Sequence, residues 1–203
     1  MPTQPVRKSQ KQRKEESEEK LFKALIQIIN SDGVMAATCQ RIGDQAGVSR
    51  GLATQRLGRR DIMFARLVDR LTQAQYDRLE AEGVNTLAPG DALRRYIDIH
   101  FEDIQHDPGY QAYFVMVAAA IAADPTLRDC VTQAEKFVQD ILESHIRRGQ
   151  QDGAFDRSID PQSHAGNIGS TLLGAAIQSR LTGPENINQL KPSAYALVDA
   201  IEQ

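Results

Sequence analysis

Apolar side chains recur every three or four positions along most of the chain, a spacing that brings them onto one face of an α-helix. The clearest stripe runs through Leu93, Tyr96, Ile97, His100, Phe101 and Ile104. Runs that alternate apolar and polar residues are absent, and no Asn-Gly or Asp-Gly pair joins two β-branched runs. We therefore predict an all-α protein of about nine helices.

Glycine, proline and helix-capping residues divide this pattern into separate helices. Asp32-Gly33 ends a first helix, and Pro108-Gly109 and Asp124-Pro125 separate later ones. Asp160-Pro161 is typical of an N-cap followed by proline in the first helical turn. The predicted helices cover about 15–32, 38–46, 50–56, 59–82, 90–107, 110–123, 125–149, 161–182 and 192–202.

The second and third predicted helices, 38–46 and 50–56, are separated by a very short turn. A helix-turn-helix needs a glycine where the chain reverses, an apolar residue in the turn and a cap on the second helix. Gly47, Val48 and Ser49 supply these in order. In such a motif the second helix lies in the major groove of DNA, where arginine binds guanine and glutamine binds adenine. The side chains with that chemistry are Arg50, Gln55 and Arg56.

The chain of 203 residues has a net charge of −3, and this small value conceals an uneven distribution. Residues 1–70 hold 14 Lys and Arg against 8 Asp and Glu, whereas residues 71–203 hold 10 against 19. A basic front and an acidic rear indicate two parts with different partners, and the front is a candidate for binding a polyanion. The first 14 residues have no apolar period, so we expect a mobile basic arm there.

Composition excludes several classes of protein. Hydrophobic residues make up 41% and charged residues 25%, as in ordinary globular proteins. No stretch approaches the ~20 apolar residues of a membrane-spanning helix, and the N-terminus lacks an apolar signal core. Cys39 and Cys130 form no metal or redox motif, which fits a reducing compartment. We therefore expect a cytoplasmic protein with no membrane partner.

The turn at 46–49 alone would also fit a plain helical hairpin inside an all-α core. Its surroundings favour DNA binding over that alternative. They include the net positive charge of the front, the basic arm and Arg59-Arg60 at the start of the next helix.

Over about residues 18–67 the sequence resembles the TetR-type transcriptional regulators. The matching positions are, in order, Gly33, Thr38, Ile42, Ala46-Gly47-Val48-Ser49-Arg50-Gly51 and Arg60-Asp61. The rear half is similar to that family only in being acidic and helical. The resemblance implies a three-helix DNA-binding domain (15–58) after the arm (1–14), a connecting helix (59–82), and a ligand-binding and dimerisation domain (83–203).

The resemblance also implies which residues contact double-stranded DNA. Residues of the helix-turn-helix and the next helix start would contact the groove or the phosphates: Thr38, Gln40, Arg50, Gly51, Thr54, Gln55, Arg56 and Arg60. Basic residues of the arm either follow the minor groove, screen phosphates or belong to a solvated tail. The arm residues in question are Lys11, Arg13 and Lys14.

Three positions depart from the family's usual pattern. This chain has Thr54 where the family usually has Tyr, Leu57 where it has Phe, and Arg60 where it has Lys. Thr54 keeps a hydroxyl but loses the reach of the ring. The operator sequence therefore cannot be transferred from relatives.

Aromatic side chains concentrate in the rear half: Tyr96, Phe101, Tyr110, Tyr113, Phe114 and Phe137. They either pack against one another in a core or surround a cavity for an apolar ligand, which tyrosine hydroxyls and His100 would orient. The TetR resemblance implies the cavity, so a small, largely apolar effector is expected. The predicted pocket residues are Tyr96, His100, Phe101, Tyr113, Phe114, Val117, Phe137 and Ile141.

Small residues recur four apart along the predicted helix 161–182. They let another helix approach closely, either within the chain or in a second copy. The resemblance implies a homodimer formed by the last two helices. Two-fold pairing also suits a short recognition helix, because it doubles the bases read across half-sites ~34 Å apart. The predicted interface residues are Gly166, Ser170, Leu173, Gly174, Ile177, Val198 and Ile201.

Neither an enzyme nor a metal site is expected, and no cofactor. His100 and His106 lie on different faces of one predicted helix, and the sequence has no Gly-rich phosphate loop, HExxH or Gly-x-Ser-x-Gly. Taken with the helix-turn-helix, the resemblance implies a homodimeric repressor that a small-molecule effector releases from a near-palindromic operator. The alternative is a helical dimeric small-molecule-binding or interaction protein of the same fold that reads no specific operator.

Overall fold

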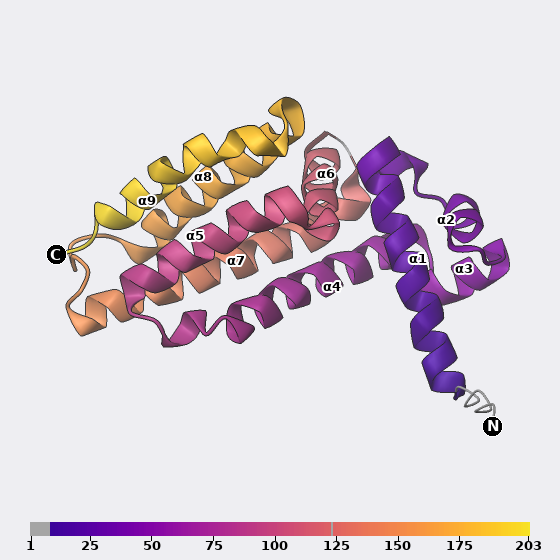
Figure 1. Ribbon diagram of the computed structural model, residues 1–203, viewed down its shortest axis with the longest axis horizontal. Helices are drawn as coiled ribbons and strands as arrows, with labels where there is room; N and C mark the ends of the chain where they lie inside the picture. Colours follow the sequence, from indigo (N-terminus) through magenta and orange to yellow (C-terminus); the bar gives the residue numbers. More distant parts are fainter. Residues whose placement is uncertain (1–8, 123) are drawn as a thin grey trace, which may run out of the picture.

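The computed structural model describes residues 9–122 and 124–203. These residues fold into nine α-helices and three short 3₁₀ segments. Figure 1 shows α1, α2 and α3 gathered at one end and the later helices side by side at the other, with α4 running between them. The elements are α1 (Gln10–Asp32), η1 (Val34–Ala36), α2 (Cys39–Ala46), α3 (Arg50–Leu57), α4 (Arg60–Ala81), η2 (Val84–Thr86), α5 (Pro89–His106), α6 (Pro108–Ala122), α7 (Pro125–Asp152), α8 (Pro161–Thr182), η3 (Pro184–Leu190) and α9 (Lys191–Asp199).

One face of α1 holds the N-terminal part together. Leu21, Leu25, Ile28 and Ile29 on that face are fully buried, as the apolar stripe predicts. Both α2 and α3 pack against α1, and Leu57 at the end of α3 is also fully buried. Burial of each such side chain contributes about 1.5–3 kcal/mol, so α1 organises the three-helix unit.

The helix α4 belongs to both parts of the molecule. Its first half buries Met63, Phe64 and Leu67, and α4 also packs against α7 in the rear part. A second connection is made by α6, which packs on α1, where the Asn30 side chain donates to the Pro108 carbonyl at 2.8 Å. The two parts therefore share a continuous helix and a direct packing surface.

Proline begins four helices of the rear part, because the first turn has no use for the N–H that proline lacks. These residues are Pro89, Pro108, Pro125 and Pro161. Among these helices α7 packs against α8, and α5 packs against α9. After α7 the chain folds back so closely that a Cβ at Gly149 would lie 2.1 Å from the Phe155 ring. Glycine is therefore needed at this position.

The predicted class and most helix boundaries are confirmed. Thr38, Ser49 and Asp160 each cap a helix, and each side chain accepts a hydrogen bond from a backbone N–H of the first turn. Among the described residues no strand forms, and one isolated β-bridge joins Phe155 to Glu202. None of the helices in this part of the chain has the length and apolar character to cross a membrane.

The predicted mobile arm is wrong for residues 10–14, which are helical. The Ser9 hydroxyl accepts from the Gln12 N–H at 3.1 Å, and the Gln12 side chain accepts from the Ser9 N–H at 2.9 Å. This reciprocal pair is a capping box, and it starts α1 several residues ahead of position 15, where the predicted first helix begins. The rest of the predicted arm, residues 1–8, lies outside the described residues.

Candidate nucleic-acid interface and internal cavity

Two glycines fix the turn between α2 and α3. Gly47 adopts the left-handed conformation, with φ 69° and ψ 33°, which residues with a Cβ rarely adopt. Gly43 lies where the chain approaches itself, because a Cβ there would be 2.9 Å from the Val48 carbonyl oxygen. The role of Gly47 was predicted from its position. That of Gly43 was not, although a glycine inside a helix often marks a close approach.

The helix α3 turns one face inward and the other to solvent. Ala53 and Leu57 are fully buried on the inner face. The exposed face holds four of the residues predicted to contact DNA: Arg50, Gly51, Thr54 and Gln55. Thr38 and Gln40, at the start of α2, are exposed as well. The helix-turn-helix thus presents a polar surface on an apolar base.

The basic start of α1 lies beside the end of α3. Arg56 lines a surface groove whose other cationic residues are Lys11, Arg13 and Lys14. The Arg66 guanidinium donates to the Arg56 carbonyl and anchors this end of α3 to α4. Within the described residues, the Arg56 Nε has no hydrogen-bond partner. Four cationic side chains therefore gather on one side of the helix-turn-helix, where they would attract a polyanion.

Two residues expected to touch DNA phosphate have protein partners instead. The Gln40 amide donates to Asp44 Oδ1 at 2.8 Å. The Arg60 guanidinium donates to the Val34 carbonyl at 3.2 Å and to Asp124 Oδ2 at 2.9 Å. Asp124 lies between α6 and α7, so Arg60 ties the start of α4 to the rear part.

A small cavity lies between α4, α5, α6, α7 and α8, with a volume of about 40 Å³. That is room for about two or three water molecules, far less than a drug-sized ligand needs. The polar residues around it include Gln75, Tyr96, His100, Tyr110, Tyr113 and Glu135. The apolar residues include Leu71, Phe114, Val138, Leu172 and Leu173.

Half of the predicted pocket residues line this cavity: Tyr96, His100, Tyr113 and Phe114. The others do not. Phe101 and Val117 are buried in the core, Ile141 packs against that core, and Phe137 lines a separate surface groove between α4 and α7. Leu173, predicted at the dimer interface, lines the cavity.

Gln75 and Glu135 were not predicted at the cavity. Each is one polar position on an amphipathic helix, α4 or α7, and nothing local distinguishes it from neighbours that face solvent. Only the packing of α4 and α7 around the other helices brings them inward.

His100 is held in one neutral tautomer. Its Nε2 lies 2.9 Å from the Leu172 carbonyl oxygen, which can only accept, so Nε2 carries the hydrogen. The other ring nitrogen, Nδ1, then accepts from the Tyr110 hydroxyl at 2.7 Å. Burial lowers the pKa of His100 to about 4, against the opposing effect of the Leu172 hydrogen bond. The Gln75 amide donates in turn to the Tyr110 hydroxyl at 3.2 Å.

Glu135 is the acidic group of the cavity. The Tyr113 hydroxyl donates to its Oε1 at 2.7 Å. Burial raises the pKa of Glu135, and the bond from Tyr113 lowers it by less. Burial, first, and the nearby Glu135 also raise the pKa of Tyr113, so the tyrosine keeps its proton and remains the donor.

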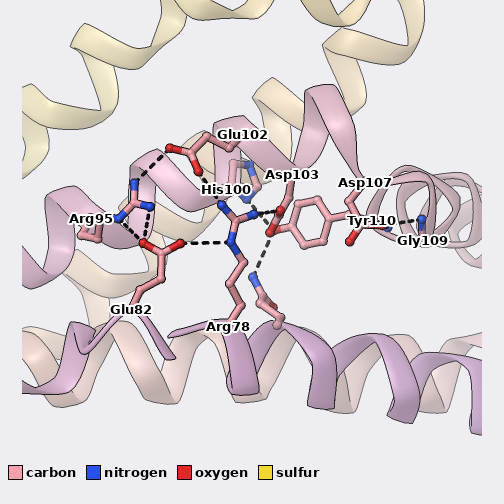
Figure 2. A network of polar contacts seen from close by, with 10 residues as sticks. Arg78, Glu82, Arg95, His100, Glu102, Asp103, Asp107, Gly109 and Tyr110 are labelled. Atoms are coloured by element: carbon pink, nitrogen blue, oxygen red, sulfur yellow. Dashed lines mark hydrogen bonds and ion pairs between the residues drawn. The ribbon is translucent and has the colours of Figure 1, made fainter. Parts of the chain in front are cut away.

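An ion-pair network beside the cavity fastens the end of α4 to α5, as Figure 2 shows. Arg78 on α4 contacts Glu82, Glu102 and Asp103, and Arg95 on α5 contacts Glu82 and Glu102. The Asp103 side chain is only 8% exposed. Its burial raises its pKa to about 6, although Arg78 acts in the opposite direction. Several carboxylates shared by two guanidiniums hold this end of α4 in place.

The predicted dimer residues divide into two groups. Val198 and Ile201 are fully buried within the chain, so their prediction as surface for a partner is wrong in this structure. Their side chains fill the core beside α8, and the Ile201 carbonyl accepts from the Asp156 N–H at 2.9 Å. On α8 the outcome differs, because a Cβ added at Gly166 or at Gly174 would meet no atom within 4 Å.

Gly166, Ser170, Gly174 and Ile177 continue along α8 to Leu181, which is 82% exposed. This row, which we call the α8 stripe, is at least partly open to solvent along its length.

Among the described residues, no group of three or more His, Cys, Asp or Glu side chains is placed to hold a metal ion.

Comparisons with known proteins show which solved structures share this fold. No family model matches the chain, and no curated protein matches it either. Among solved structures, a TetR transcription regulator from Haloarcula marismortui ATCC 43049 is similar over 93% of this chain and 100% of its own, with a TM-score of 0.80 and 20% identity. A TetR-family regulator from Agrobacterium tumefaciens is similar over 94% and 100%, with a TM-score of 0.80 and 15% identity.

The complex of SmeT with triclosan is also similar, over 93% of this chain and 92% of that one, with a TM-score of 0.79 and 21% identity. Structural neighbours across nearly the full chain are therefore TetR-family transcriptional regulators. An N-terminal helix-turn-helix followed by a helical C-terminal domain is the fold of that family. The resemblance seen in the sequence is confirmed at the level of the fold.

Proposed function

We propose that this protein is a DNA-binding transcriptional regulator that acts as a homodimer and is released from a near-palindromic operator by a small-molecule effector. The observation that carries the proposal is the helix-turn-helix, on which α3 presents Arg50, Thr54 and Gln55 to solvent above a fully buried base. Arginine and glutamine side chains on such a helix read guanine and adenine in the major groove. We also propose that Gly51 approaches the groove.

Phosphate binding would come from the flanks of this helix. Lys11, Arg13 and Lys14 share a groove with Arg56, so a duplex lying on α3 also meets the start of α1. Thr38 lies exposed at the start of α2. Each phosphate contact releases counterions, so binding should weaken steeply with added salt.

We propose the α8 stripe as the dimer interface. Small residues let two helices approach closely, and nothing within the described chain covers Gly166 or Gly174. Ile177 and Leu181 add apolar area at one end of the row. A second copy packed there by two-fold symmetry would present two recognition helices to the two halves of a palindrome.

The small volume of the cavity supports coupling between effector and DNA. A drug-sized ligand needs far more room than this cavity offers, so the surrounding helices would have to move, and α4 contributes Leu71, Thr72 and Gln75 to the wall. One end of α4 is held by the Arg78 network, while the other carries the helix-turn-helix. Expansion of the cavity therefore displaces the DNA-binding end. The similar structure of SmeT is a complex with triclosan, which agrees with a small-molecule effector for this fold.

The test is selection of random DNA fragments by the purified protein at ~0.15 M salt, after removal of any molecule carried through purification. We expect one near-palindromic sequence to be enriched. Arg50→Ala, on the exposed face of α3, should weaken binding to that sequence by ~1–3 kcal/mol and relax one operator position. Arg147→Ala on α7, an exposed arginine paired with Glu143, is the matched control and should change neither.

A second candidate is an interaction protein of the same fold that reads no specific operator. Two observations favour it: the short Thr54 side chain, and the engagement of Arg60 by Asp124. For this candidate, DNA selection with folded, dimeric protein would enrich no sequence.

A further inference from the structure

The cavity has an unusual balance of charge. Among its lining residues in the described structure, Glu135 is the one acidic side chain, and none is lysine or arginine. His100 also lines the cavity, but its imidazole is neutral and both of its ring nitrogens are already hydrogen-bonded. The cavity therefore offers a carboxylate without a matching cation.

The hydrogen bonds of Glu135 leave it able to accept more. Its Oε1 accepts from Tyr113, and Oε2 has no hydrogen-bond donor among the described residues. A carboxylate offers about four lone-pair sites, so the half-buried Glu135 can accept further hydrogen bonds. A ligand that donates a hydrogen bond or carries positive charge would complete this environment.

Aromatic rings share the remaining walls with aliphatic side chains such as Leu71 and Val138. Tyr110 and Phe114 lie edge to face with their ring centroids 5.1 Å apart, and Tyr113 and Phe114 do so at 5.2 Å. These rings surround a cavity that also contains Glu135. Aromatic faces attract a cation, most strongly when the site is shielded from water, and they also pack against an aromatic ligand.

An anionic ligand would find the opposite conditions. The Gln75 amide nitrogen already donates to the hydroxyls of Tyr96 and Tyr110. A ligand carboxylate would face Glu135 with no guanidinium or ammonium among the described lining residues to compensate. Two carboxylates in one site disfavour each other's charge.

We propose that the effector is a compact aromatic amine, protonated at neutral pH, whose ammonium group binds Glu135 while its ring lies among Tyr110, Tyr113 and Phe114. This inference rests on the proposed function and names the chemistry of its effector. It requires the cavity to open, since even one aromatic ring exceeds the volume present. Aromatic carboxylates and neutral analogues of the same shape bind more weakly.

Three naphthalene probes with the same ring system test this order: 1-naphthylmethylamine, 1-naphthylmethanol and 1-naphthoate. Their binding to the full-length protein is measured by titration calorimetry at pH 7. We expect the amine to bind roughly 10- to 100-fold more tightly than the alcohol, the range of a charge-assisted hydrogen bond. The carboxylate should bind most weakly. Equal affinities, tightest binding of the carboxylate or no binding of the amine at millimolar concentration would overturn the proposal.

Variants on α7 locate the effect. Glu135→Gln keeps the size of the side chain and removes its charge, so the amine should lose most of its advantage while the alcohol binds as before. Glu143→Gln is the matched control, because Glu143 is on the same helix but pairs with Arg147 at the surface. Unchanged amine binding by a folded Glu135→Gln protein would exclude Glu135 as the partner. Should that variant not fold, the order of the three probes on the unaltered chain still decides.

The operator assay separates this inference from the proposed function. If the amine binds through Glu135 but no DNA sequence is ever enriched, the ligand class stands and the regulatory role fails. If an operator is found and the amine does not bind, the regulatory role stands and the ligand class fails. Both stand if the amine releases the operator from the unaltered protein and does so much less from Glu135→Gln.

Discussion

Arginine side chains at the two ends of this molecule have opposite surroundings. On α3, Arg50 and Arg56 have no carboxylate partner among the described residues. In the rear part, Arg78, Arg94 and Arg95 each contact two or three carboxylates. Other front arginines, such as Arg66 and Arg70, do pair with carboxylates, so the two unpaired guanidiniums are a feature of α3 itself. The rear network instead uses its charge to hold helices in register.

Arg60 lies between these two situations. It stands at the start of α4, directly after the helix-turn-helix, yet its guanidinium pairs with Asp124 of the rear part. A phosphate that bound Arg60 would have to replace Asp124. Under the proposed function, a phosphate and Asp124 would therefore compete for this one guanidinium.

The largest effect is expected from breaking the front alone. Gly43→Ala places a Cβ 2.9 Å from a backbone oxygen, so the α2–α3 turn must distort. We expect a loss of roughly 2–4 kcal/mol of unfolding free energy and loss of DNA binding. Thermal unfolding and fluorescence-anisotropy binding measure the two effects.

Gly51→Ala is the control for that substitution. A Cβ at Gly51 would meet only the Ser49 Oγ, at 4.0 Å, so stability should be unchanged or slightly raised. Equal stability of the two alanine variants would show that the turn tolerates a looser approach than the structure indicates.

The next effect belongs to the rear, which contains all four histidines of the chain. Burial lowers the pKa values of His100 and His145 to about 4. The unfolded chain binds these protons near pH 6.5 and the folded chain only near pH 4, so stability is complete above pH 6.5 and is lost as the pH falls. Each imidazole removes about 1 kcal/mol per pH unit in that window.

Asp103 acts in the opposite direction, because burial raises its pKa to about 6 and its protonation favours the folded state. Because the two effects on the pH dependence of stability oppose each other, a histidine variant is needed to separate them. Between pH 7 and pH 5.5, His145→Gln should lose about 1 kcal/mol less unfolding free energy than the unaltered protein in urea titrations. Identical pH dependence of the two proteins would contradict burial of a neutral imidazole at this position.

The smallest expected effect is on DNA affinity and comes from changing the Arg60–Asp124 ion pair. Asp124→Asn keeps an N-cap on α7 but removes the negative partner of Arg60, so DNA affinity should rise by roughly 2- to 5-fold. Arg60→Ala should lower DNA affinity and reduce the slope of its salt dependence by about one unit. Measuring both at several salt concentrations tests whether Arg60 exchanges Asp124 for phosphate. If Asp124→Asn leaves DNA affinity unchanged, the pair is structural only.

The sequence predicts the helix-turn-helix better than it predicts the cavity of the rear part. The caps at Thr38 and Ser49 and the turn at Gly47 are local, because each depends on neighbours within a few residues, and all three were predictable. The cavity depends on which faces of five helices meet. Gln75 and Glu135 could not be distinguished from surface residues, and Val198 was predicted to contact a partner chain although its own chain covers it.

The start of α1 is an instructive exception, since the signal was local and still missed. Ser9 and Gln12 form a capping box three residues apart, but the basic residues around them favour a mobile segment when charge alone is considered. Charge says little about backbone conformation when a cap is present.

The narrowness of the internal cavity also sets a timescale. Thr72 and Ala134 border both the cavity and the surface groove between α4 and α7, so the two spaces adjoin there. If the proposed effector enters from the groove and these helices have to part for it, its association rate would level off at the rate of opening however concentrated it is. Departure needs the same opening. The bound state would then outlast the presence of the effector in solution, and the protein would keep a short record of past exposure.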